Sequence, residues 1–144
     1  MRGRGLTAAA AVLVFAAGAL AASGTAPRRF RADLTAASET PAPAHVPHLA
    51  GGRFTGRLLG RTLDWTLKFH TLSSKATAAD IHLGTTGQTG PVALPLCSPC
   101  SSPATGKTKL TGAEIAELAA RKLYVDLYTL KNPNGELRGQ TYKR

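Results

Sequence analysis

The clearest secondary-structure signal in the sequence is the stretch Leu63-Asp-Trp-Thr-Leu-Lys-Phe-His70. Its large apolar residues alternate with polar ones, and successive side chains of a β-strand point to opposite faces of the sheet. The stretch therefore predicts a strand with a hydrophobic core on one side and solvent on the other. Trp65 is on the apolar side, so we expect it to be a core residue rather than a platform for a ligand.

Shorter runs of the same kind occur on both sides of this strand. Turn and loop segments rich in glycine and proline separate them, above all residues 36–52 and 84–90. Asn132-Pro-Asn-Gly135 is a strong turn signal, because Asn-Gly tolerates the positive φ angles of tight hairpins. The other predicted strands are residues 30–34, 53–59, 76–83, 91–96, 123–130 and 136–142.

One segment departs from the β pattern. Thr111-Gly-Ala-Glu114 fits a capping box, and Ile115, Leu118 and Ala119 then fall on one helical face, which predicts a single short helix near residues 112–122. About seven short strands with turns at this spacing, and no repeat or βαβ pattern, indicate an all-β fold, an antiparallel sandwich.

Residues 1–21 have the layout of a secretory signal peptide. Arg2 and Arg4 form a basic head, an uncharged run from Leu6 to Leu20 follows, and small residues predict cleavage near Ala21. An uncleaved membrane anchor is the alternative, but the run is short for a span and consists mostly of alanine. We expect a secreted or extracytoplasmic protein that meets the membrane only through the signal peptide before cleavage.

The chain of 144 residues is long enough for one compact domain and too short for two. We expect residues 22–29 to form a flexible linker and residues 30–144 to form the domain. The charge is strongly basic, with 18 Lys and Arg against 8 Asp and Glu, and only Arg2 and Arg4 belong to the signal peptide.

A basic surface outside the cytoplasm favours anionic partners such as cell-wall polymers, lipid headgroups or acidic polysaccharide. The cations are scattered along the sequence and aromatic residues are few, which argues against a nucleic-acid partner. The alternative interpretation is a charged surface that serves only solubility.

Cys97 and Cys100 are the two cysteines, in the order Cys-Ser-Pro-Cys. Thiols outside the cytoplasm are normally oxidised, so we expect one local disulfide that orders its loop. A thioredoxin-like redox pair has the same spacing. That chemistry needs a helix N-terminus in a βαβ setting, whereas this motif lies in a Ser/Pro loop between β segments.

Residues 30–144 resemble the CHRD (chordin-type) domain family. The resemblance rests on four landmarks: Phe30-Arg-Ala-Asp-Leu34 with Glu39-Thr-Pro41, Ala79-Asp-Ile-His-Leu-Gly84, Leu123-Tyr-Val-Asp-Leu-Tyr-Thr129, and Asn132-Pro-Asn-Gly-Glu-Leu-Arg-Gly-Gln140. It implies a Greek-key β-sandwich like that of copper-zinc superoxide dismutase, in secreted or cell-surface proteins. The last landmark is the most specific, and we expect a structural role for its residues Asn132, Pro133, Gly135, Glu136, Arg138, Gly139 and Gln140.

The sequence departs from this family where a metal would be considered. Members commonly carry His-Ile-His in the fourth predicted strand and a histidine before the threonine of the sixth, whereas this chain has Asp80, Ile81, His82 and Tyr128 there. Asp80 and His82 still share one face of a strand and are weak candidate ligands. A hydrogen-bonded Asp–His pair is the alternative, because a metal usually needs three or four ligands.

The remaining histidines and the last strand provide only weak candidates for a functional site. His45 and His48 share a loop at a chelating spacing, and His70 ends a strand; we expect solvated side chains. Glu136 and Arg138 share a face of the last strand and are expected to pair with each other or with neighbouring strands, while Gly139 lets another backbone approach closely.

No nucleophilic triad, phosphate loop or pair of glycosidase carboxylates is evident in the sequence. We therefore expect a non-catalytic binding or structural module without a cofactor. The alternatives are a metal-binding enzyme of the superoxide-dismutase type, supported only by fold analogy, and a secreted thiol oxidoreductase.

Overall fold

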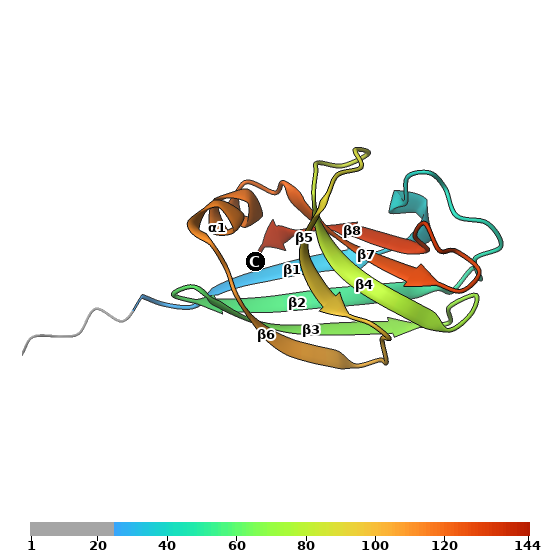
Figure 1. The fold of residues 1–144 in the computed structure, drawn as a ribbon, viewed down its shortest axis with the longest axis horizontal. Coiled ribbons are helices and arrows are strands. Elements are labelled where there is room, and N and C mark those ends of the chain that lie inside the picture. The colour runs from blue at the N-terminus through green and yellow to red at the C-terminus, as the bar shows by residue number, and fades with distance from the viewer. Residues whose placement is uncertain (1–24) are drawn as a thin grey trace, which may run out of the picture.

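The structure, a computed structural model, describes residues 25–144, which form two antiparallel sheets and one short helix (Figure 1). The predicted signal peptide of residues 1–21 lies outside the described residues. The five-stranded sheet has the order β6-β3-β2-β1-β9, with β6 at Ala104–Lys109, β3 at Thr62–His70, β2 at Gly51–Leu59, β1 at Arg28–Leu34 and β9 at Tyr142–Lys143. The four-stranded sheet has the order β5-β4-β7-β8, with β5 at Val92–Cys97, β4 at Ala76–Leu83, β7 at Leu123–Thr129 and β8 at Leu137–Gln140.

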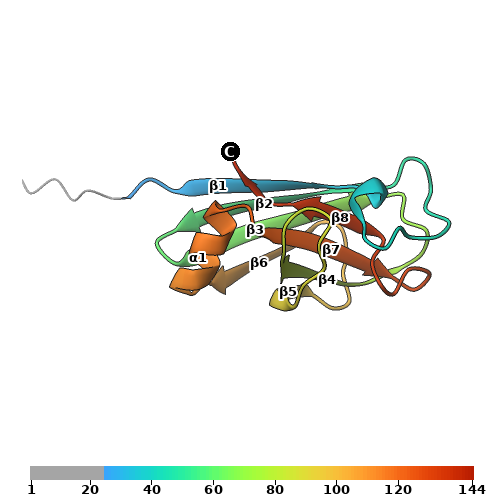
Figure 2. The ribbon, with the colours of Figure 1, turned by 90° about the horizontal axis from the view of Figure 1, so that it is seen from above.

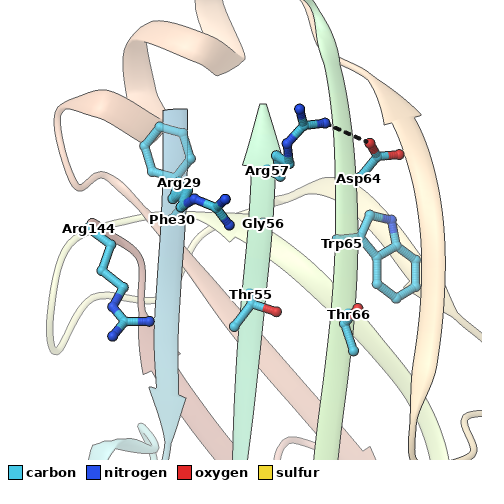
Figure 3. A pocket seen from close by; sticks show the side chains of 9 residues that line it. All are labelled: Arg29, Phe30, Thr55, Gly56, Arg57, Asp64, Trp65, Thr66 and Arg144. Carbon is cyan, nitrogen blue, oxygen red and sulfur yellow. Dashed lines mark ion pairs between the residues drawn. The ribbon is translucent and has the colours of Figure 1, made fainter. Parts of the chain in front are cut away.

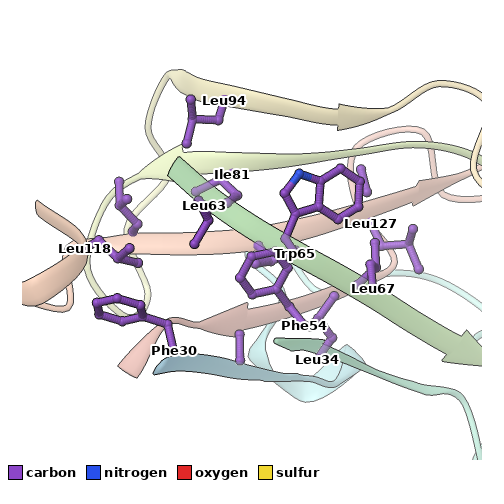
Figure 4. Close-up of a cluster of buried hydrophobic side chains, with 14 of the residues drawn as sticks. Phe30, Leu34, Phe54, Leu63, Trp65, Leu67, Ile81, Leu94, Leu118 and Leu127 are labelled. Atoms are coloured by element: carbon purple, nitrogen blue, oxygen red, sulfur yellow. The ribbon is translucent and has the colours of Figure 1, made fainter. Parts of the chain in front are cut away.

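The two sheets form layers that face each other across one hydrophobic core (Figures 2 and 4). Phe54 and Leu67 enter this core from the five-stranded sheet, and Ile81 and Leu127 enter it from the four-stranded sheet; all four are fully buried. Trp65 is 6% exposed and belongs to the same core, as its place in the alternating stretch predicts. The predicted mostly β, antiparallel architecture with one short helix is confirmed.

Strand β6 is absent from the strands predicted above. Its residues facing solvent are Thr105, Lys107 and Lys109, and its inward positions carry only small or polar side chains, so it has no hydrophobic period to detect. Its inward Gly106 pairs with Trp65, and a Cβ atom there would lie 2.5 Å from the Cζ2 atom of that indole. The glycine lets the strand lie over the tryptophan and cover it.

The prediction of one continuous last strand over residues 136–142 is wrong. The segment is two strands, β8 in one sheet and β9 in the other, separated at the buried Thr141. The Thr141 hydroxyl donates to the Leu123 carbonyl at 2.8 Å, which fixes the chain where it passes between the layers. A hydrophobic alternation does not show such a change of sheet, because the pattern is the same on both sides of the crossing.

The helix α1 covers Gly112–Ala119, so the predicted region near 112–122 is right at its start and too long at its end. The capping box is confirmed: Thr111 Oγ1 accepts from the Glu114 amide at 3.1 Å, and the Glu114 carboxylate accepts from the Thr111 amide at 2.6 Å. Arg121, with a φ of 60°, lies outside helical geometry. Within residues 25–144, no helix has the length and apolar character needed to span a membrane.

Candidate functional site

Asp80 and His82 lie on the outer face of the four-stranded sheet, the face turned away from the core. Ala79 and Ile81 of the same strand are fully buried in the core, so the residues that alternate with them point the other way. The two predicted candidates therefore share a face, as their spacing indicates. His82 is only 8% exposed, because neighbouring side chains and the loop of residues 84–90 cover it.

Both ring nitrogens of His82 are hydrogen-bonded. Nδ1 lies 2.9 Å from the Gly90 carbonyl oxygen, which only accepts, so Nδ1 carries a hydrogen. Nε2 lies 2.6 Å from the Tyr128 hydroxyl, and in the neutral ring it accepts from that group. Burial raises the pKa of Tyr128, and the neighbouring acids Asp126 and Asp80 raise it further, so its hydroxyl keeps its proton.

Tyr124 is sandwiched between His82 and Arg138. The His82 ring stacks on Tyr124 with centroids 5.1 Å apart, and the Arg138 guanidinium carbon lies 3.5 Å from the Tyr124 centroid. Arg138 Nη2 donates to the carbonyl oxygens of Thr85 and Gln88 at 3.1 and 2.5 Å. This stack ties the loop of residues 84–90 to the sheet.

Glu39 and Asp126 form a pair of buried acids beside this stack. They are 6% and 5% exposed, and Glu39 Oε2 and Asp126 Oδ1 lie 2.6 and 2.9 Å from the position that a Cβ atom would take at Gly135. Burial and the adjacent Glu39 raise the pKa of Asp126 from 3.8 to about 8, against the lowering effect of Arg138. The sequence does not reveal this pair, because Glu39 and Asp126 meet only through the packing of a loop on the sheet.

Glu136 of the last family landmark is fully buried among donors. Its carboxylate accepts from the Ser73 amide at 2.7 Å, the Ser73 hydroxyl, the Thr129 hydroxyl at 2.5 Å and the Asn132 amide at 3.1 Å. Burial raises the pKa of Glu136, but the hydrogen bonds from Ser73, Thr129 and Asn132 outweigh it and hold the pKa below its ordinary value. Glu136 and Arg138 thus bind neighbouring segments rather than each other.

Gly139 lies at a close approach between the two sheets. A Cβ atom at Gly139 would be 2.4 Å from the Asp33 carbonyl oxygen, and Thr35 and Arg138 exchange backbone hydrogen bonds of 3.0 and 3.1 Å. The close backbone approach expected at Gly139 is confirmed.

The residues present do not fit a metal with three or four protein ligands. His82 uses both of its nitrogens, while His45, His48 and His70 are exposed, two in the loop after β1 and one at the end of β3. Across the described part of the chain, no three His, Cys, Asp or Glu side chains gather closely enough to hold an ion. His82 belongs instead to the hydrogen-bonded network of the outer face, and Asp80 lies on the same face beside it.

Cys97 and Cys100 form the predicted disulfide, with Cα atoms 5.2 Å apart. Cys97 ends β5, and the buried Cys100 packs against the core. The bond closes the turn that leads from one sheet to the other.

The outer face of the five-stranded sheet is of a different kind: it is crowded with cations. The pairing of β1, β2, β3 and β6 puts alternate residues of each strand on this side. We call it the basic face; it carries eight cations and two carboxylates, namely Arg29, Arg31, Arg53, Arg57, Lys68, Lys107, Lys109 and the adjacent Arg144, with Asp33 and Asp64. The cations look scattered in the sequence, and the sheet gathers them.

The two carboxylates neutralise only part of this charge. Asp33 pairs with Arg31 at 2.7 Å and Arg53 at 3.0 Å, and the hydrogen bonds from these groups lower its pKa to about 2. Asp64 makes longer contacts, 3.3 Å to Lys107 and 3.9 Å to Arg57. Four cations of the face have no carboxylate within ion-pair distance among residues 25–144: Arg29, Lys68, Lys109 and Arg144.

A hollow of about 250 Å³ opens on this face over β1, β2 and β3 (Figure 3). Three arginines, Arg29, Arg57 and Arg144, lie around it, with the Thr55 and Thr66 side chains on the same side of the sheet. A guanidinium group offers a planar fork of donors to carboxylate, sulfate or phosphate oxygens. Of the surfaces described, this one is best suited to hold an anionic ligand.

Comparison with known proteins agrees with the four landmarks. No curated protein and no solved structure matches the chain. A family model, that of the CHRD domain, matches residues 30–141, which is most of the chain and includes every landmark. This protein therefore belongs to the CHRD domain family.

Proposed function

We propose that this protein is a non-catalytic extracytoplasmic module that binds an anionic polymer of the cell wall or cell surface through its basic face. The observation that carries the proposal is the gathering of eight cations and two carboxylates on one side of a single sheet. Charges of one sign on one surface add to a field that attracts a polyanion and holds it by many weak contacts. Such binding weakens as salt screens the charges.

The hydrogen bonding of the opposite face, on the four-stranded sheet, supports a non-catalytic role. A general base must be free to take a proton from a substrate. His82 already uses both nitrogens, and Glu136 is buried among its donors. These groups hold loops to the sheet, and a surface organised in this way stabilises the fold rather than a transition state.

An extracytoplasmic location is supported by the predicted signal peptide of residues 1–21 and by the Cys97–Cys100 disulfide. The disulfide lies between two strands and no helix begins at it, so the helix dipole that lowers a redox thiol's pKa is missing from its surroundings. The alternative of a secreted thiol oxidoreductase therefore has less support. It predicts insulin-reductase activity, which we expect the purified protein to lack.

We further propose that the two sheets form a Greek-key sandwich of the superoxide-dismutase type. Strands β4 and β5 are neighbours, β6 passes to the other sheet, and β7 returns to lie beside β4. This order supports the proposal, because the fourth strand of a Greek key returns to lie beside the first. Fold likeness does not imply the enzyme's function. Elemental analysis of protein purified without chelators tests the enzyme alternative; stoichiometric copper, zinc or iron would support it against our proposal.

Retention on immobilised polymers tests the proposed function. The purified protein is applied to an anionic wall polymer and to neutral dextran, and eluted with rising NaCl. We expect retention on the anionic support alone, with release as salt increases. Equal retention on both supports, or retention that salt does not affect, would contradict the proposal.

A further inference from the structure

The basic face contains a furrow that runs along β2 and β3. Three hollows of about 250, 310 and 310 Å³ adjoin one another there, and each shares two residues with the next. Thr55 and Thr66 are common to the first and second, and Arg53 and Lys68 to the second and third. The shared residues make the three hollows one continuous path from Arg57 toward the end of β3.

Strand register gives this furrow a pattern of charged and uncharged rows. Arg57 pairs with Asp64, Thr55 with Thr66, and Arg53 with Lys68, so a row of two hydroxyls separates two rows that carry cations. Neighbouring rows are two residues apart along each strand, about 7 Å, and the two charged rows are therefore about 13 Å apart.

The two ends of the furrow differ in how strongly they attract an anion. Arg29 and Arg144 add to the first charged row, and neither has a carboxylate partner among residues 25–144. At the other row Arg53 is engaged by Asp33 at 3.0 Å, which leaves Lys68 as the available cation. An anion is thus held most firmly at the arginine end and a second one at Lys68.

We infer that the furrow binds a linear anionic polysaccharide whose negative groups are separated by neutral, hydroxylated sugar units. This inference rests on the proposed function and specifies its ligand. The anionic groups lie at the two charged rows, and a neutral sugar lies over Thr55 and Thr66. Threonine hydroxyls both donate and accept hydrogen bonds, as sugar hydroxyls do, so the middle row matches the neutral unit in chemistry.

A densely charged polymer fits this pattern less well. Polyphosphate carries charge on every unit, so part of it would lie over the threonine row, where the neighbouring cation of β1, Arg31, is already engaged by Asp33 at 2.7 Å. Its affinity would come from the total charge of the face and would not depend on the hydroxyls. The two ligand types therefore respond differently to removal of the threonine hydroxyls.

The test uses the double variant Thr55→Val and Thr66→Val, which removes both hydroxyls and keeps the charge and the approximate shape. Its affinity is measured by calorimetry at low salt for hyaluronan oligosaccharides, which carry one carboxylate per disaccharide, and for inorganic polyphosphate. We expect hyaluronan binding to weaken about tenfold, the size expected for two lost hydrogen bonds, and polyphosphate binding to stay as in the wild type.

Two further variants control for charge. Arg57→Gln with Lys68→Gln removes a cation from each row and should weaken binding of both polymers. Lys75→Gln with Lys131→Gln removes the same charge from exposed positions next to the four-stranded sheet and should weaken neither. Unchanged thermal transitions of all variants show that the fold is intact.

The outcomes separate this inference from the proposed function. If the threonine variant binds hyaluronan as the wild type does, or if the wild type prefers polyphosphate, the inference is wrong while a polyanion-binding role stands. If the wild type binds neither polymer better than neutral dextran, the proposed function itself fails.

Discussion

Asp126 illustrates how single residues in this protein depend on their neighbours. Its carboxyl is buried beside Glu39, and the charge of Arg138 and the hydroxyl of Tyr128 partly compensate this burial. Burial and the neighbouring carboxyl of Glu39 both favour the neutral form of Asp126. At neutral pH the raised pKa of Asp126 keeps its proton in place and so prevents repulsion between the loop of Glu39 and strand β7.

The pH dependence of stability should report this proton. The folded protein has an Asp126 pKa of about 8 and the unfolded chain one near 3.8, so between these values the folded state holds a proton that unfolding releases. Wild-type stability should therefore fall as pH rises from 4 to 8 more steeply than that of Asp126→Asn, by up to several kcal/mol at about 1.4 kcal/mol per pKa unit. Urea unfolding at several pH values measures the difference; parallel pH profiles would contradict it.

Glu136→Gln should destabilise the protein. The substitution replaces an acceptor of four hydrogen bonds with an amide that presents its own donors to Ser73, Thr129 and Asn132, at a cost of about 1–3 kcal/mol. The pKa of Glu136 is lowered in the folded state, so this contribution is present above pH 4.5 and is lost as pH falls through the folded value. Urea midpoints test this, with the half-buried, weakly paired Glu117→Gln as the control; equal midpoints at neutral pH would refute it.

At the scale of elements, β1 and β8 of opposite layers approach each other closely at Gly139. Gly139→Ala places a methyl group 2.4 Å from the Asp33 carbonyl oxygen, so the strands must separate and part of the core must loosen. We expect a loss of about 2 kcal/mol or more, in the range of overpacking substitutions.

Gly112→Ala is the matched control for Gly139→Ala. It lies at the start of α1 with no atom within 4 Å of the added group, so it should leave stability unchanged or raise it by a few tenths of a kcal/mol. Thermal unfolding compares the two variants. Similar melting temperatures for them would show that the close crossing does not limit the packing.

The elements also show what a sequence reveals and what it hides. Strand β3 and the start of α1 could be predicted, because strict alternation and a capping box are local signals. Strand β6 could not, since it covers Trp65 with a glycine and small or polar residues instead of a large apolar side chain. The change of sheet at Thr141 has no periodic signature either.

The candidate site was predictable only in part, for the same reason. Asp80 and His82 could be placed on one face from their spacing. The hydrogen-bond partners of His82, however, are Gly90 and Tyr128, which come from other segments. The basic face depends on the pairing of four strands, so cations that look dispersed in the sequence are neighbours in the sheet.

On the scale of the whole molecule, the two outer faces have opposite characters. The four-stranded sheet carries buried polar groups that bond to one another and to covering loops, whereas the five-stranded sheet presents exposed cations. The first arrangement stabilises the fold, and the second is repulsive within the free protein. A surface that costs stability in this way is expected where a ligand of opposite charge compensates it.

This repulsion should be measurable as a salt effect on stability. Raising NaCl from low to moderate concentration screens the cations of the basic face, so the melting temperature should rise by a few degrees, the shift that about 1 kcal/mol produces in a domain of this size. The rise should be smaller for Arg29→Gln with Arg57→Gln. A melting temperature that falls with salt would mean that the ion pairs of Asp33 and Asp64 outweigh the repulsion.

The most direct test of the basic face as the ligand site is a map of amide NMR chemical shifts during titration with an anionic polysaccharide. We predict salt-sensitive shifts concentrated in residues 53–57 of β2 and 64–68 of β3, with β4 and β7 unaffected. Shifts centred on His82 and Tyr128 would contradict the account. So would the absence of shifts under salt conditions in which the immobilised polymer retains the protein.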